Sequence, residues 1–385
     1  MTARRQFHSF DALRFFAFLK VFFLHIPVAA FPVFNFLKNG GGTGVIFFFV
    51  LSGFLITYIL LSEKAGSGTI NLKSFYLRRI LRIWPLYYLI LFIAFITPFL
   101  VSLFHLQSSG EGYEPNWVMS CLYLENYQMI RMNGHPNVSP LGVTWSLCIE
   151  EHFYLFWGLL LYFLPVKKLP LVLGLLLALA HVARYFFTLH GWLTIDLLTN
   201  IDYFVYGAIP AFLLVCQKKK LLAWITQISF GTKIFLIVLT IFYVEVSPNI
   251  SYPFQLYVEP VLFGVCFSGV ICLILPDKNA LRIDDRSPFS RLGRYTYGMY
   301  LYHTIVINLL LHVFDKTGAW SGSIPKVLLF IVIAFLVTTG ISLLSYYCFE
   351  RYFLMLKKKW AARAGEEAIT AFAGPVERPS GDRYQ

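Results

Sequence analysis

The sequence predicts an all-α membrane protein, a polytopic bundle of about ten transmembrane helices with both termini in the cytoplasm. Of its 385 residues, 58% are hydrophobic and only 14% are charged. Soluble domains carry about 25% charged residues, so this composition excludes a soluble enzyme held by a single anchor. The prediction therefore depends on two further observations, the apolar stretches and the distribution of positive charge.

Apolar stretches long enough to cross a bilayer recur along the chain. A spanning helix needs about 20 apolar residues, and about ten stretches meet that length. They are residues 10–31, 43–62, 83–104, 145–164, 169–188, 197–216, 230–247, 256–276, 294–314 and 325–348. The apolar stretch from Trp117 to Tyr123 is too short to cross, and we expect it to be re-entrant or to lie at the interface.

Lysine and arginine gather in alternate predicted loops. Most of the 32 basic residues fall in the segments 4–5, 64–82, 167–168, 218–220, 278–294 and 351–383. Because cytoplasmic loops are enriched in these residues, we predict that these segments and both termini lie inside. The net charge of +12 then belongs mainly to the cytoplasmic face, where topology and anionic lipid explain it. No nucleic-acid partner is predicted.

The chain is predicted to form one continuous membrane domain. This domain covers residues 1–352, and the polar segment 353–385 is expected to be a disordered cytoplasmic tail. The six cysteines stand singly, without a Cys/His cluster at metal-ligand spacing. We therefore predict no metal cofactor.

The first predicted span carries several ionisable side chains: Asp11, Arg14, Lys20 and His25. Such groups are costly in hydrocarbon, so a span that contains them is a candidate functional site. His25 lies about 22 Å along the helix from Phe10, in the outer half of the membrane. A structural hydrogen bond is the alternative explanation for this histidine.

Two adjacent carboxylates, Glu150 and Glu151, follow the start of a span that runs inward from the outside. They lie about one to two turns below the outer surface, at a depth similar to that of His25. A histidine and a carboxylate there could act as a base and its orienting group. Only one of the two can face His25, because neighbours on a helix diverge by about 100°. An interfacial helix cap is the alternative.

A basic segment, Arg78, Arg79 and Arg82, precedes the third span. Arg78 and Arg82 are four residues apart, so one helix face would present two guanidinium groups that suit phosphate oxygens. A positive-inside stop signal explains the same residues. In the second span, Ser52 and Gly53 favour close helix packing over substrate binding.

Several of these residues resemble the sequence motifs of a known protein family. Asp11, Leu13, Arg14 and His25 resemble the first-helix signature of the acyltransferase 3 family of membrane-bound O-acyltransferases. Further similar motifs follow in the family's order at residues 47–54 (FFFVLSGF), 78–85 (RRILRIWP), 145–154 (WSLCIEEHFY), 297–303 (YGMYLYH) and 349–351 (FER). Two positions depart from the family pattern: Tyr352 stands where proline is usual, and His152 replaces a common glutamine. Neither touches the expected chemistry.

The resemblance implies transfer of an acyl group, most simply acetyl, from cytosolic acyl-CoA to a hydroxyl of an extracytoplasmic or lipid-linked carbohydrate. It further implies a multi-pass protein of the bacterial inner membrane, in contact with lipid. In this interpretation His25 is the general base or a transient acyl acceptor, assisted by Glu150 or Glu151. The implied donor-binding residues are Arg14, Arg78, Arg79 and Arg82, and the implied acceptor-binding residues are Asp11, Trp145, Tyr154 and His303.

A transporter or flippase is the alternative from another functional class. Many spans with buried ionisable groups are typical of transporters as well. Transporters often consist of two related halves, and no such internal symmetry is visible in this sequence. A requirement for acyl-CoA would distinguish the enzyme from the transporter.

Overall fold

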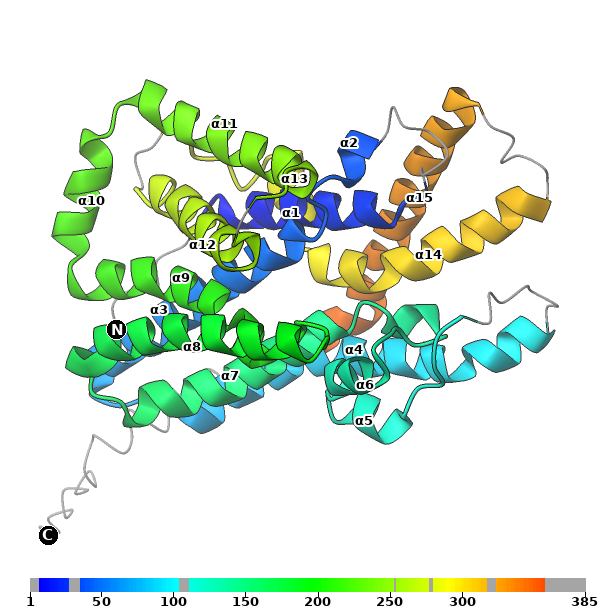
Figure 1. Ribbon diagram of the computed structural model, residues 1–385, viewed down its shortest axis with the longest axis horizontal. Helices are drawn as coiled ribbons and strands as arrows, with labels where there is room; N and C mark the ends of the chain where they lie inside the picture. Colours follow the sequence, from blue (N-terminus) through cyan, green and yellow to red (C-terminus); the bar gives the residue numbers. More distant parts are fainter. Residues whose placement is uncertain are drawn as a thin grey trace, which may run out of the picture.

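The chain is helical in almost every segment that the structure describes. A computed structural model describes residues 7–27, 35–103, 111–252, 254–276, 280–316 and 323–356. Within these ranges the only β pairing is an isolated bridge between Tyr113 and Pro136. The all-α prediction is therefore confirmed (Figure 1).

Fifteen α-helices follow one another along the described ranges. They are α1 (Phe10–His25), α2 (Asn35–Lys38), α3 (Thr43–Ser67), α4 (Leu72–Leu103), α5 (Trp117–Cys121), α6 (Glu125–Met132), α7 (Trp145–Phe163), α8 (Leu169–Leu189), α9 (Leu197–Cys216), α10 (Lys218–Gln227), α11 (Phe230–Val246), α12 (Gln255–Leu273), α13 (Pro288–Gly293), α14 (Thr296–Lys316) and α15 (Ile324–Ser345). A π-helical turn, Tyr346–Glu350, continues α15.

Eight helices of the described ranges are long and apolar enough to cross a membrane. They correspond to eight of the predicted spans, and α9 coincides with the predicted 197–216. The other two predicted spans correspond to α1, which has 16 residues, and α7, which carries Glu150 and Glu151 in its first half. The chain is thus a multi-pass membrane protein, while the count of ten spans and the location of the termini stay predictions.

Three segments differ in extent from their predictions. In the span predicted at 10–31 the helix ends at His25, and Ile26 is extended. The predicted span 83–104 begins inside α4, which starts at Leu72, so the three arginines lie on the same continuous helix as the span. Pro85 and Pro98 lie inside this helix, as membrane helices tolerate where neighbours satisfy the freed backbone groups. The helix after α15 continues to Leu356, and the rest of the expected tail, 357–385, lies outside the described residues.

Side-chain bonds bring several predicted cytoplasmic segments together. Lys64, near the end of α3, donates to the carbonyls of Leu161, Tyr162 and Leu164 at 2.7, 3.0 and 2.9 Å. It therefore caps the end of α7 with a cation, where the helix dipole favours one. These bonds place the ends of α3 and α7 on the same side of the bundle, as the predicted topology requires.

Helices α3 and α9 touch backbone to backbone at two glycines. A Cβ atom on Gly207 would lie 1.8 Å from the carbonyl oxygen of Val50, and one on Gly53 would lie 2.0 Å from that of Phe204. Small residues allow this approach in membranes, where dispersion contacts rather than water exclusion drive helix association. The packing interpretation of Gly53 is confirmed.

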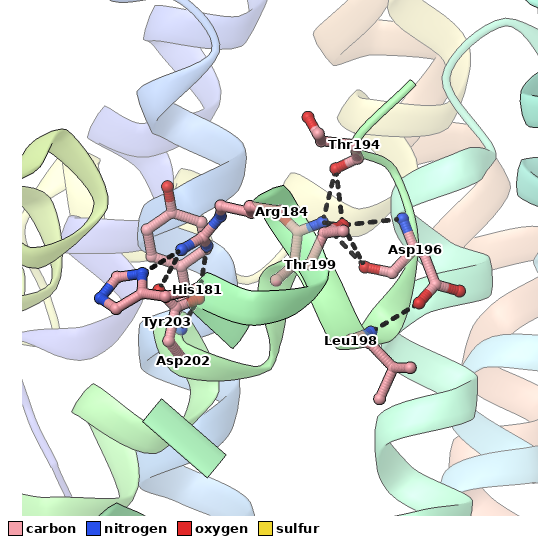
Figure 2. Close-up of polar contacts among 9 residues, drawn as sticks. His181, Arg184, Thr194, Asp196, Leu198, Thr199, Asp202 and Tyr203 are labelled. Atoms are coloured by element: carbon pink, nitrogen blue, oxygen red, sulfur yellow. Dashed lines mark hydrogen bonds and ion pairs between the residues drawn. The ribbon is translucent and has the colours of Figure 1, made fainter. Parts of the chain in front are cut away.

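A buried ion pair joins α8 to α9 (Figure 2). Arg184 Nη1 and Nη2 each donate to one carboxylate oxygen of Asp202 at 2.6 Å, and the two side chains are 4% and 0% exposed. The guanidinium lies 5.2 Å from the centre of the Tyr203 ring, and His181 Nδ1 accepts from it at 3.5 Å. Both charges are thereby neutralised inside the bundle.

The start of α9 is fixed by a capping box, also visible in Figure 2. The Asp196 carboxylate accepts from the backbone N–H of Leu198 at 2.7 Å, and Thr199 Oγ1 accepts from the Asp196 N–H at 3.2 Å. The cap satisfies N–H groups that the first helical turn leaves without partners. It holds α9 in the register that its glycine contact and its ion pair require.

We predict that Gly207→Val separates α3 from α9 and destabilises the protein by about 3 kcal/mol or more, because the new side chain meets backbone rather than a movable side chain. The control is Gly174→Val on α8, where a Cβ meets nothing within 4 Å. Thermal unfolding of the detergent-solubilised variants, followed by size-exclusion chromatography, measures the difference. Equal midpoints for the two variants would show that the close contact is not required.

We also predict that Arg184→Met destabilises the fold by about 3–5 kcal/mol, because it leaves the Asp202 carboxylate buried without its cation. Replacing both partners, as in Arg184→Met with Asp202→Leu, should recover most of that loss, since no buried charge then remains. The same thermal assay measures both variants. A double variant as unstable as the single one would contradict this account of the pair.

Candidate active site

A cavity of about 120 Å³ lies among α1, α3, α4, α7 and α14. Its wall contains three arginines, Arg14, Arg79 and Arg82, and one carboxylate, Glu150. The other polar lining residues are Ser52, Ser146, Tyr154, Thr296, Tyr297 and Tyr300. The apolar lining residues are Val45, Phe48, Phe49, Leu55, Ile56, Ile83 and Leu147. Cationic groups in a largely apolar wall favour an anionic or strongly polarised ligand.

The arginines of α4 divide between two environments. Arg79 and Arg82 are three residues apart, share a helix face and reach the cavity. Arg78 does not line the cavity: it donates to Ser74, and its Nη2 lies 3.5 Å from Glu63 Oε2. The pair that shares the cavity face is therefore Arg79 and Arg82, rather than the expected Arg78 and Arg82, and donor binding by Arg78 stays a prediction.

The cavity arginines also differ in their partners. Arg14 Nη1 lies 2.5 Å from Asp11 Oδ1, three residues earlier on α1, so its charge is balanced locally. The Arg79 guanidinium lies 5.6 Å from the centre of the Tyr154 ring. Its buried Nε has no hydrogen-bond partner among the described residues. Arg79 lines the cavity, and unlike Arg14 it has no carboxylate partner among the described residues, so its guanidinium charge remains for a ligand.

Glu150 is the carboxylate that faces the cavity. Its Oε2 accepts from the Tyr154 hydroxyl at 2.7 Å, and its Oε1 accepts from Ser52 Oγ at 3.2 Å. Tyr154 is one turn further along α7, and Ser52 comes from α3. The side chain of Ser52 therefore contributes to the site, although its neighbour Gly53 serves packing alone. Close packing was predicted for both residues, and for Ser52 the structure instead places the hydroxyl in the cavity wall.

Glu151 points to the other side of α7. Its Oε2 accepts from Trp84 Nε1 at 3.3 Å, and its buried Oε1 has no partner among the described residues. Adjacent residues diverge by about 100° on a helix, so the two glutamates cannot share one surface. The structure thus assigns Glu150, and not Glu151, to the cavity.

His25 forms a pair with His303 of α14. The His25 Nδ1 atom lies 2.9 Å from the carbonyl oxygen of Val21 and 3.3 Å from His303 Nε2. The two ring centres are 4.8 Å apart, with the planes at 76°. His303 is completely buried, and its Nδ1 lies 2.5 Å from the carbonyl oxygen of Tyr300. His303 was expected to bind the acceptor.

The expected contact between His25 and an acidic residue of α7 is not among these bonds. The Tyr300 hydroxyl bonds Ser146 Oγ at 2.7 Å and donates to the Val143 carbonyl at 2.9 Å, so the start of α7 lies beside Tyr300. Glu150 is four residues further along, about 6 Å deeper. Tyr300 lines the cavity, and its backbone carbonyl also accepts from His303. It therefore links the histidine pair to the cavity residues.

Two further residues with expected acceptor-binding roles lie around the cavity. The Trp145 ring packs edge-on against Phe49 with 6.4 Å between ring centres, behind the cavity wall. Tyr154 lines the cavity itself. Asp11, as described above, is occupied by Arg14. Tyr300 was not expected as a site residue, although it lies in the same sequence motif as His303.

Comparison with known proteins decides the family. Residues 7–347 match the family model of acyltransferase 3, described as an acyltransferase domain. The chain belongs to this acyltransferase family. No solved structure matches it significantly.

Several curated bacterial proteins are similar to the chain. It is 30% identical over 367 residues to the peptidoglycan O-acetyltransferase OatA of Listeria monocytogenes. This match covers 86% of the chain and 54% of that protein. It is 35% identical over 159 residues to the putative peptidoglycan O-acetyltransferase YrhL of Bacillus subtilis, covering 41% and 24%. A putative O-acetyltransferase of Staphylococcus aureus is 26% identical over 357 residues, covering 86% and 54%. The chain spans about half the length, or less, of these relatives.

Proposed function

We propose that this protein is an integral-membrane O-acyltransferase, specifically an O-acetyltransferase, that uses cytosolic acetyl-CoA to acetylate a hydroxyl of an extracytoplasmic or lipid-linked carbohydrate. The observation that carries the proposal is the cavity in which Arg14, Arg79 and Arg82 meet Glu150. Membership of the acyltransferase family supports it, as do relatives named peptidoglycan O-acetyltransferases. These bacterial relatives also support a location in the bacterial plasma membrane.

The cavity suits the acyl end of the donor. Pockets for whole cofactors usually measure about 300–1,000 Å³, and this one measures about 120 Å³. It therefore holds a short acyl thioester and not the nucleotide. The guanidinium of Arg79, which lines this cavity, is placed to bind the thioester oxygen of the donor. Such charge-assisted bonds are strong where water is excluded.

His25 acts on the acceptor. As the acceptor hydroxyl oxygen attacks the thioester carbonyl carbon, His25 Nε2 takes the hydroxyl proton. The carbon–sulfur bond then breaks, and the CoA thiolate leaves with the proton that the imidazolium returns. A transient acyl group on His25 would use the same nitrogen. Bonds donated to the developing oxyanion by the Arg79 guanidinium stabilise the transition state.

Glu150 organises the donor side of the site. Its two carboxylate oxygens accept from Tyr154 and from Ser52, so it fixes the Tyr154 ring beside the Arg79 guanidinium. In this role Glu150 holds the cavity wall in one arrangement before the donor binds, which is how preorganised sites gain their advantage over water.

We predict that His25→Ala lowers acetyl transfer at least about 100-fold, because a positioned base contributes about 10²–10⁴ to such rates. Membrane vesicles receive radiolabelled acetyl-CoA, and label is counted in the lipid and glycan fractions at matched amounts of folded protein. The control is His190→Ala, since His190 Nδ1 makes the same bond to a carbonyl four residues earlier, at 2.8 Å, on an exposed helix end. Equal labelling by all variants would remove His25 from the chemistry. Substrate flux without any need for CoA would favour the transporter.

We further predict that Arg79→Gln raises the KM for acetyl-CoA about 10- to 100-fold, since a hydrogen bond to a charged group contributes about 1.5–3 kcal/mol. Arg78→Gln is the matched control, because Arg78 bonds Ser74 outside the cavity. Initial rates in vesicles at varied acetyl-CoA concentration give both constants. A larger rise in Arg78→Gln would move donor binding to the other face of α4.

A further inference from the structure

The environment of His303 holds its ring in one orientation. The side chain is completely buried on α14, and the Phe18 ring of α1 packs against it edge to face, with 5.9 Å between ring centres and 89° between planes. At its Nδ1, the ring lies 2.5 Å from the Tyr300 carbonyl oxygen. Buried rings with both packing and hydrogen-bond partners lose their rotational freedom, so the Nε2 atom has a fixed direction.

The partners of the two rings determine where the protons are. A carbonyl oxygen can only accept, so His303 Nδ1 carries the proton that bonds Tyr300. In a neutral imidazole the other nitrogen is then an acceptor. This acceptor, His303 Nε2, lies 3.3 Å from His25 Nδ1.

The same reasoning fixes the state of His25. Its Nδ1 faces two acceptors, the Val21 carbonyl oxygen at 2.9 Å and His303 Nε2 at 3.3 Å. The proton of His25 is therefore on Nδ1 and shared between these two acceptors. The Nε2 atom of His25 is left with its lone pair, and this is the state that a general base requires.

We propose that His303 is a positioning residue for His25. It orients the His25 ring and favours the tautomer with an unprotonated Nε2. Its hydrogen bond from His25 Nδ1–H becomes stronger once His25 is an imidazolium. The inference rests on the proposed function for its chemical meaning. In this inference the group that orients His25 is the neutral ring of His303, and not Glu150 as expected from the sequence.

A neutral orienting group suits this position in the bundle. In proteases, a buried carboxylate orients the catalytic histidine. A second uncompensated charge beside His25 would be costly within a membrane helix bundle. A neutral imidazole supplies the acceptor without that cost, and its own proton is held by a backbone carbonyl. Base, orienting group and anchor thus form one chain of bonds from His25 through His303 to Tyr300.

The kinetic experiment compares His303→Leu with His303→Gln in vesicles, at matched amounts of folded protein. Leucine keeps an apolar side chain without an acceptor, whereas the glutamine oxygen can still accept from His25 Nδ1. We expect kcat to fall about 10- to 100-fold in His303→Leu, with the KM for acetyl-CoA unchanged, and to recover in part in His303→Gln. His312→Leu, nine residues further along α14, is the control and should keep full kcat.

Three kinetic outcomes would overturn the inference. Wild-type kcat in His303→Leu would show that His25 needs no second partner. Equal losses in His303→Gln and His303→Leu, at matched folded protein, would show that packing at this position matters and the acceptor does not. A rise in KM for the donor with unchanged kcat would place His303 in donor binding instead.

A spectroscopic test separates this inference from the proposed function. The ¹⁵N chemical shifts of labelled histidines in lipid nanodiscs report which ring nitrogen is protonated, and His25→Asn and His303→Gln assign the signals. We expect an unprotonated Nε2 on both rings in the wild type. A proton on His303 Nε2 overturns the inference even if the protein transfers acetyl groups. The expected shifts uphold the assigned protonation states of both rings even if acetyl transfer fails.

Discussion

The requirement that ionisable groups inside a membrane bundle find partners within the protein governs this structure. Arg184 pairs with Asp202, Lys20 with Glu245 at 2.6 Å, and Arg14 with Asp11. Each pair removes the cost of a lone charge in hydrocarbon, and the first two also fix two helices relative to each other. Against this background Arg79 is informative, because its Nε has no hydrogen-bond partner among the described residues and the residue lines the cavity.

Hydropathy predicted most of the helices because a membrane helix must be long enough to cross the bilayer and apolar enough to lie in it. The bounds of α9 and α7 follow almost directly from where apolar residues begin and end. It failed at α4, where Arg78 to Arg82 extend the helix below the apolar stretch. Long arginine side chains are compatible with helix geometry and only their charge breaks the apolar pattern, so hydropathy misplaces the helix start.

The sequence predicted part of the cavity wall, namely Arg14, Arg79, Arg82, Glu150 and Tyr154, but not how the candidate residues pair. Counting residues from a membrane surface gives only the depth of a residue along the membrane normal. This count predicted similar depths for His25 and Glu150. Contact also requires the rotation and tilt of each helix, which depend on packing against neighbours. Because of those rotations, Glu150 bonds Tyr154 and Ser52, and His25 bonds His303. They likewise decide that Arg79 reaches the cavity and Arg78 does not.

The glycine contact between α3 and α9 also positions one wall of the cavity. Ser52 follows the backbone of α3 directly, one residue before Gly53, whose backbone rests on that of Phe204. A slip of α3 by one helical turn would carry the Ser52 hydroxyl about 5.4 Å along the bundle, away from Glu150. The width of the cavity therefore depends on a main-chain contact made by the neighbouring residue of α3, which is not itself part of the cavity wall.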